Sequence, residues 1–279
     1  MYLADYHMHS KYSFDGCEEL ADMCDAAIAR GLTEIAVTDH MDIFTGLPYG
    51  QMIDFDVPGG KRYEMDVTGL YRELEQIRDR YEGKLTVRIG AELGQPQVNP
   101  AAAAAFLADN PQLDYVIGSV HNMENDLDVY YYDFTDMDTA AMYDHYLDWL
   151  IELARTGGFD VMGHLTYPLR YMYERQQLRL DLAPYEEKFR LLFKLLTEKG
   201  RGIEVNVSGL YREMNDTMPP FAIVKLYKEC GGEIITIGSD AHKAQHIGLY
   251  QKEARGMIEA AGFRYITGFE KRRPVFHKL

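Results

Sequence analysis

The sequence has little of what secreted and membrane proteins usually contain. Its three cysteines form no C-x-x-C pair and are too few for a disulfide framework; they are Cys17, Cys24 and Cys230. No stretch approaches the roughly 20 consecutive apolar residues that a transmembrane helix needs. The N-terminus also lacks the basic segment and long apolar run of a signal peptide. We therefore expect a cytoplasmic protein that does not enter a membrane.

Positive charge is scarce as well. The chain has 29 Lys and Arg residues against 44 Asp and Glu residues, which gives a formal net charge of −15. This charge disfavours binding to nucleic acids and to anionic membranes, so neither is expected as a partner. A small phosphorylated substrate would need a local source of positive charge, and bound metal ions would supply it. The sequence leaves the oligomeric state open.

Seven apolar segments alternate along the chain with amphipathic helical segments, and each is expected to be a β-strand. They are residues 5–10, 33–38, 85–91, 115–120, 161–163, 202–205 and 234–239. Regular alternation of strands and helices is typical of a parallel sheet with helical crossovers. A length of 279 residues also suits an α/β barrel, and no linker interrupts the chain. We predict one domain, residues 1–279, built as a parallel barrel of seven units.

The segments between the strands are predicted with less regularity. Helices are expected at residues 18–30, 66–81, 99–107, 138–155, 184–200, 248–261 and directly after Pro219-Pro220. The glycine- and proline-rich segment 41–65 is expected to be a long functional loop. A last short strand is expected at 264–267, and Lys271-Arg272-Arg273 is expected to be a solvated tail.

Candidate metal ligands lie at the ends of the predicted strands. His7 and His9 are two residues apart, so an extended strand points both imidazoles to the same side. Such a pair is half of a metal site, but it also occurs in ordinary half-buried strands. Later strand ends carry His40, Glu92, His121, His164, Asp240 and His242. Barrels place their chemistry at these ends, and imidazole with carboxylate suits zinc, iron or manganese.

These residues lie in motifs through which the chain resembles the polymerase and histidinol phosphatase (PHP) superfamily. The motifs span almost the whole chain: Asp5-x-His7-x-His9-Ser10, Thr38-Asp39-His40, Ala91-Glu92, Gly118-Ser119-Val120-His121, Gly163-His164 and Gly238-Ser239-Asp240-Ala241-His242. The resemblance implies a distorted, TIM-like (β/α) barrel of seven units with two to three divalent transition-metal ions, Zn, Mn or Fe. Their site would lie at the C-terminal ends of the strands.

The resemblance also implies how the ligands are shared among three ions. The first ion would be held by His7, His9, Glu92 and Asp240. The second would be held by Asp15, His40 and His242. The third would be held by His121 and His164, and Glu92 would bridge from the first ion to the third. Many relatives have a histidine where Asp15 aligns. The carboxylate at this position adds an oxygen ligand and tilts the second site towards manganese or iron.

Within the superfamily the chain looks most like the stand-alone histidinol-phosphate phosphatases. Its size fits them, as do Asp39-His40-Met41-Asp42, Arg170 after Gly163-His164, and Asn206-x-Ser208-Gly209-Leu210-Tyr211-Arg212. The resemblance thus implies hydrolysis of L-histidinol phosphate to L-histidinol and phosphate in histidine biosynthesis. Metal ions that share a water can generate hydroxide near neutral pH, and this hydroxide would attack phosphorus in line.

Two arginines are expected to bind the phosphate. Arg170 and Arg212 each lie a few residues beyond a predicted strand end, so each can reach the metal ions and neutralise phosphate oxygens. A surface arginine paired with one of the many acidic residues would have the same sequence pattern.

The leaving alkoxide needs a proton donor. Asp42, two residues after His40, is the first candidate for this general acid, and orienting His40 is its alternative role. His246 is the second candidate, although it could instead cap the following helix. Asp5 and Asp39 are expected to orient metal ligands.

Acidic and aromatic loops would suit a cationic leaving group. Their residues are Asp54, Asp56, Glu124, Asp126, Asp128, Tyr49, Phe55 and Tyr130 to Tyr132. An acidic face that is merely solvated remains an alternative. His145 and His277 are expected to be structural or to face solvent.

Two other functions remain open from the sequence. One is a PHP-type phosphoesterase that acts on another phosphomonoester, on phosphotyrosine, or on a nucleotide or oligonucleotide end. A nuclease would be expected to have a basic groove, and the net charge of −15 counts against one. The other is a metal-binding module without enzymatic activity, which the complete set of candidate ligands disfavours.

Overall fold

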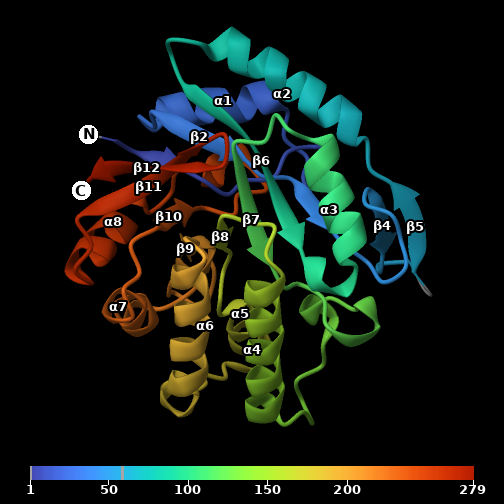
Figure 1. Cartoon of the computed structure of the whole chain (residues 1–279), viewed down its shortest axis with the longest axis vertical. Coiled ribbons are helices and arrows are strands. Elements are labelled where there is room, and N and C mark those ends of the chain that lie inside the picture. Colours follow the sequence, from blue (N-terminus) through green and yellow to red (C-terminus); the bar gives the residue numbers. More distant parts are fainter. Residues whose placement is uncertain (1, 58–59) are drawn as a thin grey trace.

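A parallel barrel forms the centre of the computed structural model, which describes residues 2–57 and 60–279 (Figure 1). Its strands are β1 (Ala4–Asp5), β2 (Glu34–Val37), β6 (Thr86–Gly94), β7 (Tyr115–Ser119), β8 (Val161–Met162), β9 (Gly202–Asn206) and β10 (Ile235–Gly238). They pair in this order, and every pair is parallel. The predicted α/β barrel of seven units is therefore confirmed.

The barrel closes between its first and last strands. The backbone N–H of Tyr6 donates to the carbonyl of Ile237 at 2.9 Å, and that of Asp240 donates to the carbonyl of His7 at 2.8 Å. One residue pair further on, Met8 and Ala241 form a parallel bridge. Residues after β1 and β10 thus continue the strand pairing beyond the short strands themselves. The seam of the barrel therefore passes directly through the predicted metal ligands.

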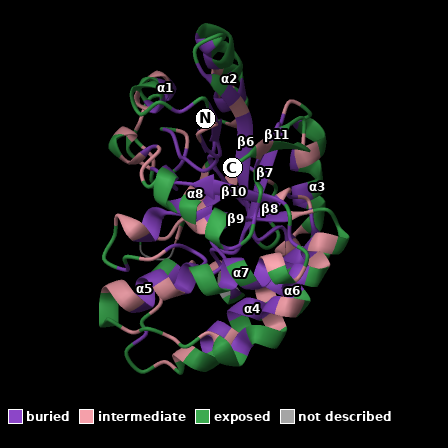
Figure 2. Cartoon of the chain, turned by 90° about the vertical axis from the view of Figure 1, so that its left-hand side faces the viewer, coloured by how far each residue is buried: buried purple, intermediate pink, exposed green. Residues whose placement is uncertain are grey.

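Helices surround the strands, with their apolar faces turned inward (Figure 2). They are α1 (Leu20–Ala29), α2 (Val67–Tyr81), α3 (Pro100–Asp109), α4 (Thr139–Thr156), α5 (Tyr167–Gln176), α6 (Glu186–Glu198), α7 (Phe221–Glu229) and α8 (Gln251–Ala260). The predicted helices are all present, and Asn99 caps α3 by accepting a hydrogen bond from the N–H of Ala102. Helix α5 was not predicted, and it carries Arg170.

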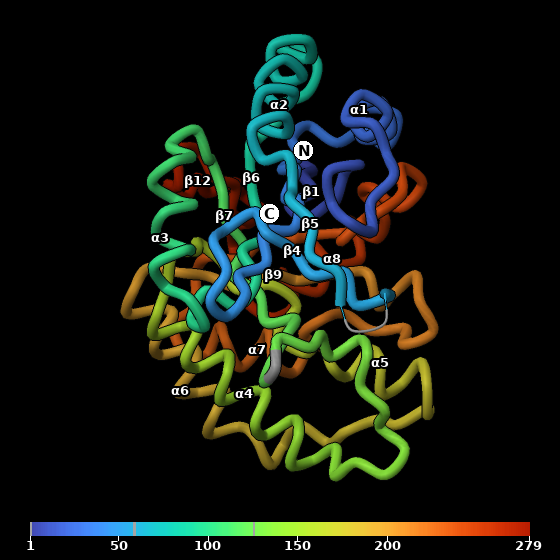
Figure 3. Tube along the Cα trace, turned by 90° about the vertical axis from the view of Figure 1, so that its right-hand side faces the viewer, coloured from blue at the N-terminus to red at the C-terminus, as the bar shows by residue number. Residues whose placement is uncertain are grey.

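The long segment after the second strand is more structured than the sequence predicts. His40–Asp42 forms β3, which pairs with β6, and a separate antiparallel hairpin consists of β4 (Gln51–Asp54) and β5 (Lys61–Glu64). The prediction of a loop over 41–65 is therefore wrong for these parts, while residues 58–59 lie outside the described chain. The β4–β5 hairpin lies at the right-hand side in Figure 1 and faces the viewer in Figure 3.

The C-terminal residues are not a solvated tail. They form the hairpin of β11 (Tyr265–Glu270) and β12 (Arg273–Lys278), and Lys271 and Arg272 make its turn. Arg272 forms an ion pair with Asp160, whose backbone precedes β8, and its N–H donates to the carbonyl of Asp114 before β7. The hairpin therefore covers the N-terminal ends of the strands, opposite the predicted site. Within the described residues, no helix is long and apolar enough to cross a membrane.

Candidate metal centre

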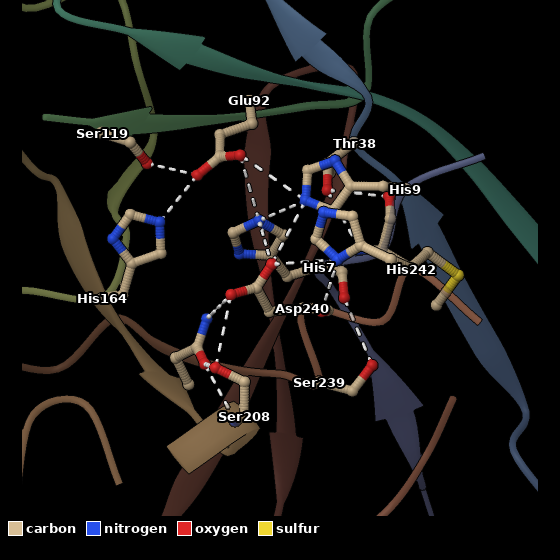
Figure 4. A network of polar contacts seen from close by, with 12 residues as sticks. His7, His9, Thr38, Glu92, Ser119, His164, Ser208, Ser239, Asp240 and His242 are labelled. Atoms are coloured by element: carbon tan, nitrogen blue, oxygen red, sulfur yellow. Dashed lines mark hydrogen bonds and ion pairs between the residues drawn. The ribbon is translucent and has the colours of Figure 1, made fainter. Parts of the chain in front are cut away.

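The structure brings the nine predicted metal ligands together at the C-terminal ends of the strands. Figure 4 shows six of them: His7, His9, Glu92, His164, Asp240 and His242. His7 and His9 follow β1, His40 lies in β3, and Glu92 lies in β6. The remaining ligands lie in loops: Asp15 before α1, His121 after β7, His164 after β8, and Asp240 with His242 after β10. Side chains from distant parts of the sequence thus converge because parallel strands end at the same rim of the barrel.

The first predicted ligand group has the spacing of a metal site. The Nε2 atoms of His7 and His9 are 3.1 Å apart. Their distances to Oε2 of Glu92 are 3.3 and 3.6 Å, and those to Oδ1 of Asp240 are 3.7 and 3.3 Å. Four atoms bound tetrahedrally to zinc at about 2.0–2.2 Å would be about 3.3–3.6 Å apart. These side chains can therefore surround one ion.

Glu92 divides its two carboxylate oxygens between two groups. Oε2 faces His7, His9 and also Nδ1 of His40, which lies 3.0 Å away. Oε1 lies 3.1 Å from Nε2 of His121 and 2.8 Å from Nε2 of His164. The Nε2 atoms of His121 and His164 are 3.3 Å apart. The bridging role that the resemblance implies for Glu92 is therefore geometrically possible.

The second predicted group lies nearer to solvent. One carboxylate oxygen of Asp15 is 2.8 Å from Nε2 of His242, and the other is 3.7 Å from Nε2 of His40. The ring of His9 stacks between those of His40 and His242, with centroid distances of 4.2 and 4.3 Å. Nitrogens of these three histidines also lie close enough to one another to share an ion.

Several buried polar atoms in the cluster have no hydrogen-bond partner. They are Nδ1 of His40, Oε2 of Glu92, Nδ1 of His164 and Nε2 of His242. Burying an unpaired polar atom is costly, and such atoms commonly contact an ion or water. All four are on predicted ligands: Glu92 of the first group, His40 and His242 of the second, and His164 of the third. The donor set and these free atoms both fit divalent metal ions.

The electrostatics of the cluster also fit a cation. Burial opposes ionisation of Glu92, but His7, His121 and His40 outweigh burial and hold the pKa of Glu92 well below its usual range. Burial, with His40 and His242 nearby, lowers the pKa of His9 to about 3. Ionised carboxylates and neutral imidazoles are the forms that bind metals. Burial acts to lower the pKa of His7, His40 and His121, but the neighbouring carboxylates outweigh it and hold the pKa of each well above its usual range. The carboxylates thus attract positive charge, which bound metal ions can supply in place of these protons.

A buried glutamate that the sequence analysis did not identify supports two ligands. Oε1 of Glu204, in β9, lies 2.7 Å from Nδ1 of His7, and Oε2 accepts a hydrogen bond from the N–H of His164 at 2.9 Å. A Cβ atom at Gly238 would lie 2.0 Å from Glu204 Oε1, so only glycine fits beside it. A glutamate within a predicted apolar strand was the signal that could have revealed this residue.

Asp5 and Asp39 act on the backbone and on serines around the ligands. The carboxylate of Asp5 accepts hydrogen bonds from the N–H groups of Ser239 and Gly248, both at 2.8 Å. Asp39 accepts hydrogen bonds from the hydroxyls of Ser10 and Ser13, both at 2.8 Å. Both carboxylates thus hold ligand-bearing loops, and neither belongs to the ligand groups described above.

A cavity of about 460 Å³ opens above the cluster. Both predicted phosphate-binding arginines line it. Arg170 is buried, with Nη1 3.5 Å from Asp240 and 3.3 Å from the hydroxyl of Ser208, and it also bonds the hydroxyl of Tyr171. Arg212 is exposed at the cavity. Both guanidinium groups therefore border the space in which a phosphate beside the metal ligands would lie.

The two candidate proton donors have different surroundings. Asp42 lines the cavity, and its Oδ1 lies 2.9 Å from Nδ1 of His121 and accepts a hydrogen bond from Gln95 at 3.2 Å. Its nearest approach to His40 is 4.0 Å, so its ligand partner is His121 rather than the predicted His40. His246 is not among the cavity residues; its ring stacks on Tyr211 at 4.5 Å.

Part of the predicted acidic and aromatic loops borders the cavity. We call this part, together with Glu174 of α5, the acidic wall: Asp54, Phe55, Asp56, Asp128, Tyr130, Tyr131 and Glu174. The other predicted residues face elsewhere. Glu124 pairs with His145, Asp126 accepts hydrogen bonds from Thr45, and the hydroxyl of Tyr49 donates to Asp109. The lining of the cavity thus combines cationic and metal-binding groups with carboxylates and aromatic rings.

The barrel fold and the ligand cluster together are those of a metal-dependent hydrolase, and a family model identifies the family to which the chain belongs. The PHP domain model matches residues 5–208, so the chain belongs to the PHP domain family. The histidinol-phosphatase of Lactococcus lactis is 27% identical over 274 residues, which cover 95% of this chain and 93% of that protein. A Thermotoga maritima protein named as a probable histidinol-phosphatase is 25% identical over 266 residues and covers 95% of each chain.

Solved structures agree with these relatives. The crystal structure of the L. lactis histidinol phosphate phosphatase, in complex with zinc, L-histidinol and phosphate, superposes with a TM-score of 0.80. It is 25% identical, and the match covers 98% of both chains. A second structure, from Listeria monocytogenes, has a TM-score of 0.74 at 22% identity and covers 89% of this chain and 99% of its own, which supports the fold.

Proposed function

We propose that this chain is a metal-dependent phosphomonoester hydrolase that converts L-histidinol phosphate to L-histidinol and phosphate. The observation that carries this proposal is the mixed lining of the cavity. It combines seven of the nine ligand residues and both arginines, Arg170 and Arg212, with the acidic wall. A phosphate monoester with a cationic alcohol matches both kinds of group at once.

The phosphate side would bind through charge. The ligand cluster would hold two to three divalent ions, which when bound would acidify water and attract the phosphoryl oxygens. Arg170 is fixed by Ser208, Tyr171 and Asp240, so its guanidinium needs little reorganisation to bind a phosphate oxygen. Arg212 lies at the exposed part of the cavity and would neutralise the remaining phosphate charge.

The alcohol side would bind through carboxylates and aromatic rings. L-Histidinol carries an amine and an imidazole, and both can be cationic. Asp128 is half-buried and accepts a hydrogen bond from Tyr167 at 3.3 Å, while Asp54 and Glu174 face the same cavity. Phe55, Tyr130 and Tyr131 would add faces on which an imidazole can stack. The aligned histidinol-phosphatases, which span nearly the whole chain, support this substrate class.

Asp42 remains our candidate for the proton donor to the leaving alkoxide. It borders the cavity, and only one of its oxygens is committed to His121 and Gln95. The second oxygen could carry the proton. His246 lies outside the cavity lining in this structure and would have to move to act.

The proposed function is tested by hydrolysis assays on metal-loaded protein. Histidinol phosphate should be hydrolysed with a higher kcat/KM than phosphotyrosine, a nucleoside monophosphate or a 5′-phosphorylated oligonucleotide. The nucleotide and the oligonucleotide have no cationic leaving group for the acidic wall to bind, and the ammonium group of phosphotyrosine is accompanied by a carboxylate. Faster hydrolysis of any of them would replace the proposed substrate, and no hydrolysis of any ester would reject the enzymatic function.

A further inference from the structure

The nine metal ligands differ sharply in their access to solvent. The side chains of His7, His9 and Glu92 are 0% exposed, and those of His121 and His164 are 4% and 2% exposed. In the second group the exposed fractions are 10% for His40, 21% for His242 and 39% for Asp15. All three side chains of that group line the cavity. Glu92, His121, His164 and Asp240 also border it but are at most 8% exposed, and His7 and His9 do not reach it.

The ligands also differ in how they are supported. In the first and third groups, most ligands have a second partner on the protein. Glu204 contacts Nδ1 of His7, Asp42 contacts Nδ1 of His121, and Ser119 donates to Oε1 of Glu92 at 2.6 Å. Such outer partners fix a ligand's orientation, and losing one typically lowers metal affinity about 10- to 100-fold.

Asp15 has no comparable support among the described residues. Its carboxylate contacts only His40 and His242, the two other predicted ligands of its group. No N–H or O–H group of the described chain donates a hydrogen bond to it, and its neighbour Phe14 is 55% exposed. The carboxylate can therefore turn away from the two histidines at little cost in protein contacts.

From these two differences we infer that the centre has one exchangeable and one sealed part. The ion of the Asp15–His40–His242 group exchanges with the solvent, while ions held through His7, His9, Glu92, His121 and His164 stay bound. This inference rests on the metal assignment of the proposed function. It adds that the activity depends on the free metal concentration through the outer ion alone, and that this ion can be replaced by another divalent metal.

The test follows metal release directly. Protein saturated with zinc is mixed with a soluble chelator, and the metal that remains on the protein is counted against time by mass spectrometry. We expect two phases, with about one ion per chain leaving at least about 10-fold faster than the rest. The Asp15→Ala variant should bind one ion fewer and lose only the fast phase. Asp54→Ala, which removes another carboxylate of the cavity, should keep both phases.

The possible outcomes are distinct. Release of all ions in one phase, or loss of slow-phase ions in Asp15→Ala, would overturn the inference. The inference would also be overturned if zinc-saturated protein held no ion in the Asp15–His40–His242 group. Because release is counted without substrate, two phases in a protein that does not hydrolyse histidinol phosphate would reject the proposed substrate and leave this inference standing. A second measurement is addition of Co²⁺ after the fast phase, which should restore one ion per chain with a cobalt absorption band in wild type but not in Asp15→Ala.

Discussion

Glu204 lies 2.7 Å from Nδ1 of His7, and it accepts a hydrogen bond from the backbone of His164 at 2.9 Å. One carboxylate thus links two strands that each deliver a metal ligand. If Nδ1 of His7 donates to Glu204, its Nε2 is left with the lone pair that faces Glu92 and Asp240. The position of the first ligand group therefore depends on a residue outside it.

Changing Glu204 should weaken metal binding. In Glu204→Gln the side chain keeps its size but loses its charge, so His7 becomes a poorer ligand. We expect metal affinity to fall about 10- to 100-fold, measured by competition with a chromophoric chelator. Glu198→Gln, on the exposed surface of α6, is the control and should bind as wild type does. An unchanged affinity in Glu204→Gln would show that His7 needs no such partner.

Removing either arginine should affect catalysis and not metal content. Arg170→Ala and Arg212→Ala each remove one positive group beside the cavity, and we expect kcat/KM to fall about 100-fold or more. Arg170→Lys should recover little, because lysine cannot reach Ser208 and Tyr171 with a planar group. Arg78→Ala, at an exposed position of α2, serves as control. Near-normal turnover in both alanine variants would mean that neither arginine binds phosphate.

The role of Asp42 can be decided from two substrates. A nitrophenolate leaves without a proton, whereas the alkoxide of histidinol does not. If Asp42 is the acid, Asp42→Asn should slow hydrolysis of histidinol phosphate far more than that of p-nitrophenyl phosphate. The ratio of the two losses cancels differences in metal loading. Equal losses would instead assign Asp42 to orienting His121, which it contacts at 2.9 Å.

Stability should depend on pH through His277 at the other end of the barrel. Its ring stacks on Tyr2 with centroids 3.5 Å apart. Burial lowers the pKa of His277, with Glu34 opposing and Arg88 reinforcing the shift. Folding therefore favours the neutral ring. The contribution of His277 to the free energy of unfolding is complete above the ordinary pKa of about 6.5, and it is lost as the pH falls towards the lowered pKa of the folded state.

His277→Phe should remove that dependence. Phenylalanine keeps an aromatic ring beside Tyr2 but cannot take up a proton. Between about pH 7 and about pH 5, the free energy of unfolding from urea titrations should fall less in the variant than in wild type. Other titrating groups, including the metal ligands, are common to both proteins and cancel in the difference. If the free energy of unfolding changes with pH equally in the variant and in wild type, the pKa of His277 is the same in the folded and the unfolded protein.

Much of the barrel could be predicted because its signals are local. Each strand is a short apolar segment that ends in a ligand-type residue, and helix ends such as Asn99 carry their own caps. Helix α5 was missed because Tyr167–Gln176 mixes aromatic and charged residues, and its buried face includes Arg170. The segment 271–273 was misread because its function as a turn depends on Asp160, a partner far away in the sequence.

The same distinction applies to the site. Ligands at strand ends could be predicted from position, because all strand ends meet at one rim. The partner of Asp42 could not, since the choice between His40 and His121 depends on the path of β3 beside β6. The acidic wall was predicted only in part because some loop carboxylates bind partners that are distant in the sequence. Asp126 turns to Thr45, whereas Asp128 faces the cavity.

The seam of the barrel has a consequence for synthesis of the chain on the ribosome. Asp5 and Ser239 are 234 positions apart, and their hydrogen bond belongs to the closure that places His7 beside Asp240. A nascent chain that ends before β10 can neither close the barrel nor complete the first ligand group. Emergence of β10 and Asp240, and not of the histidine pair at the start, thus sets the moment at which the first ligand group can first bind metal.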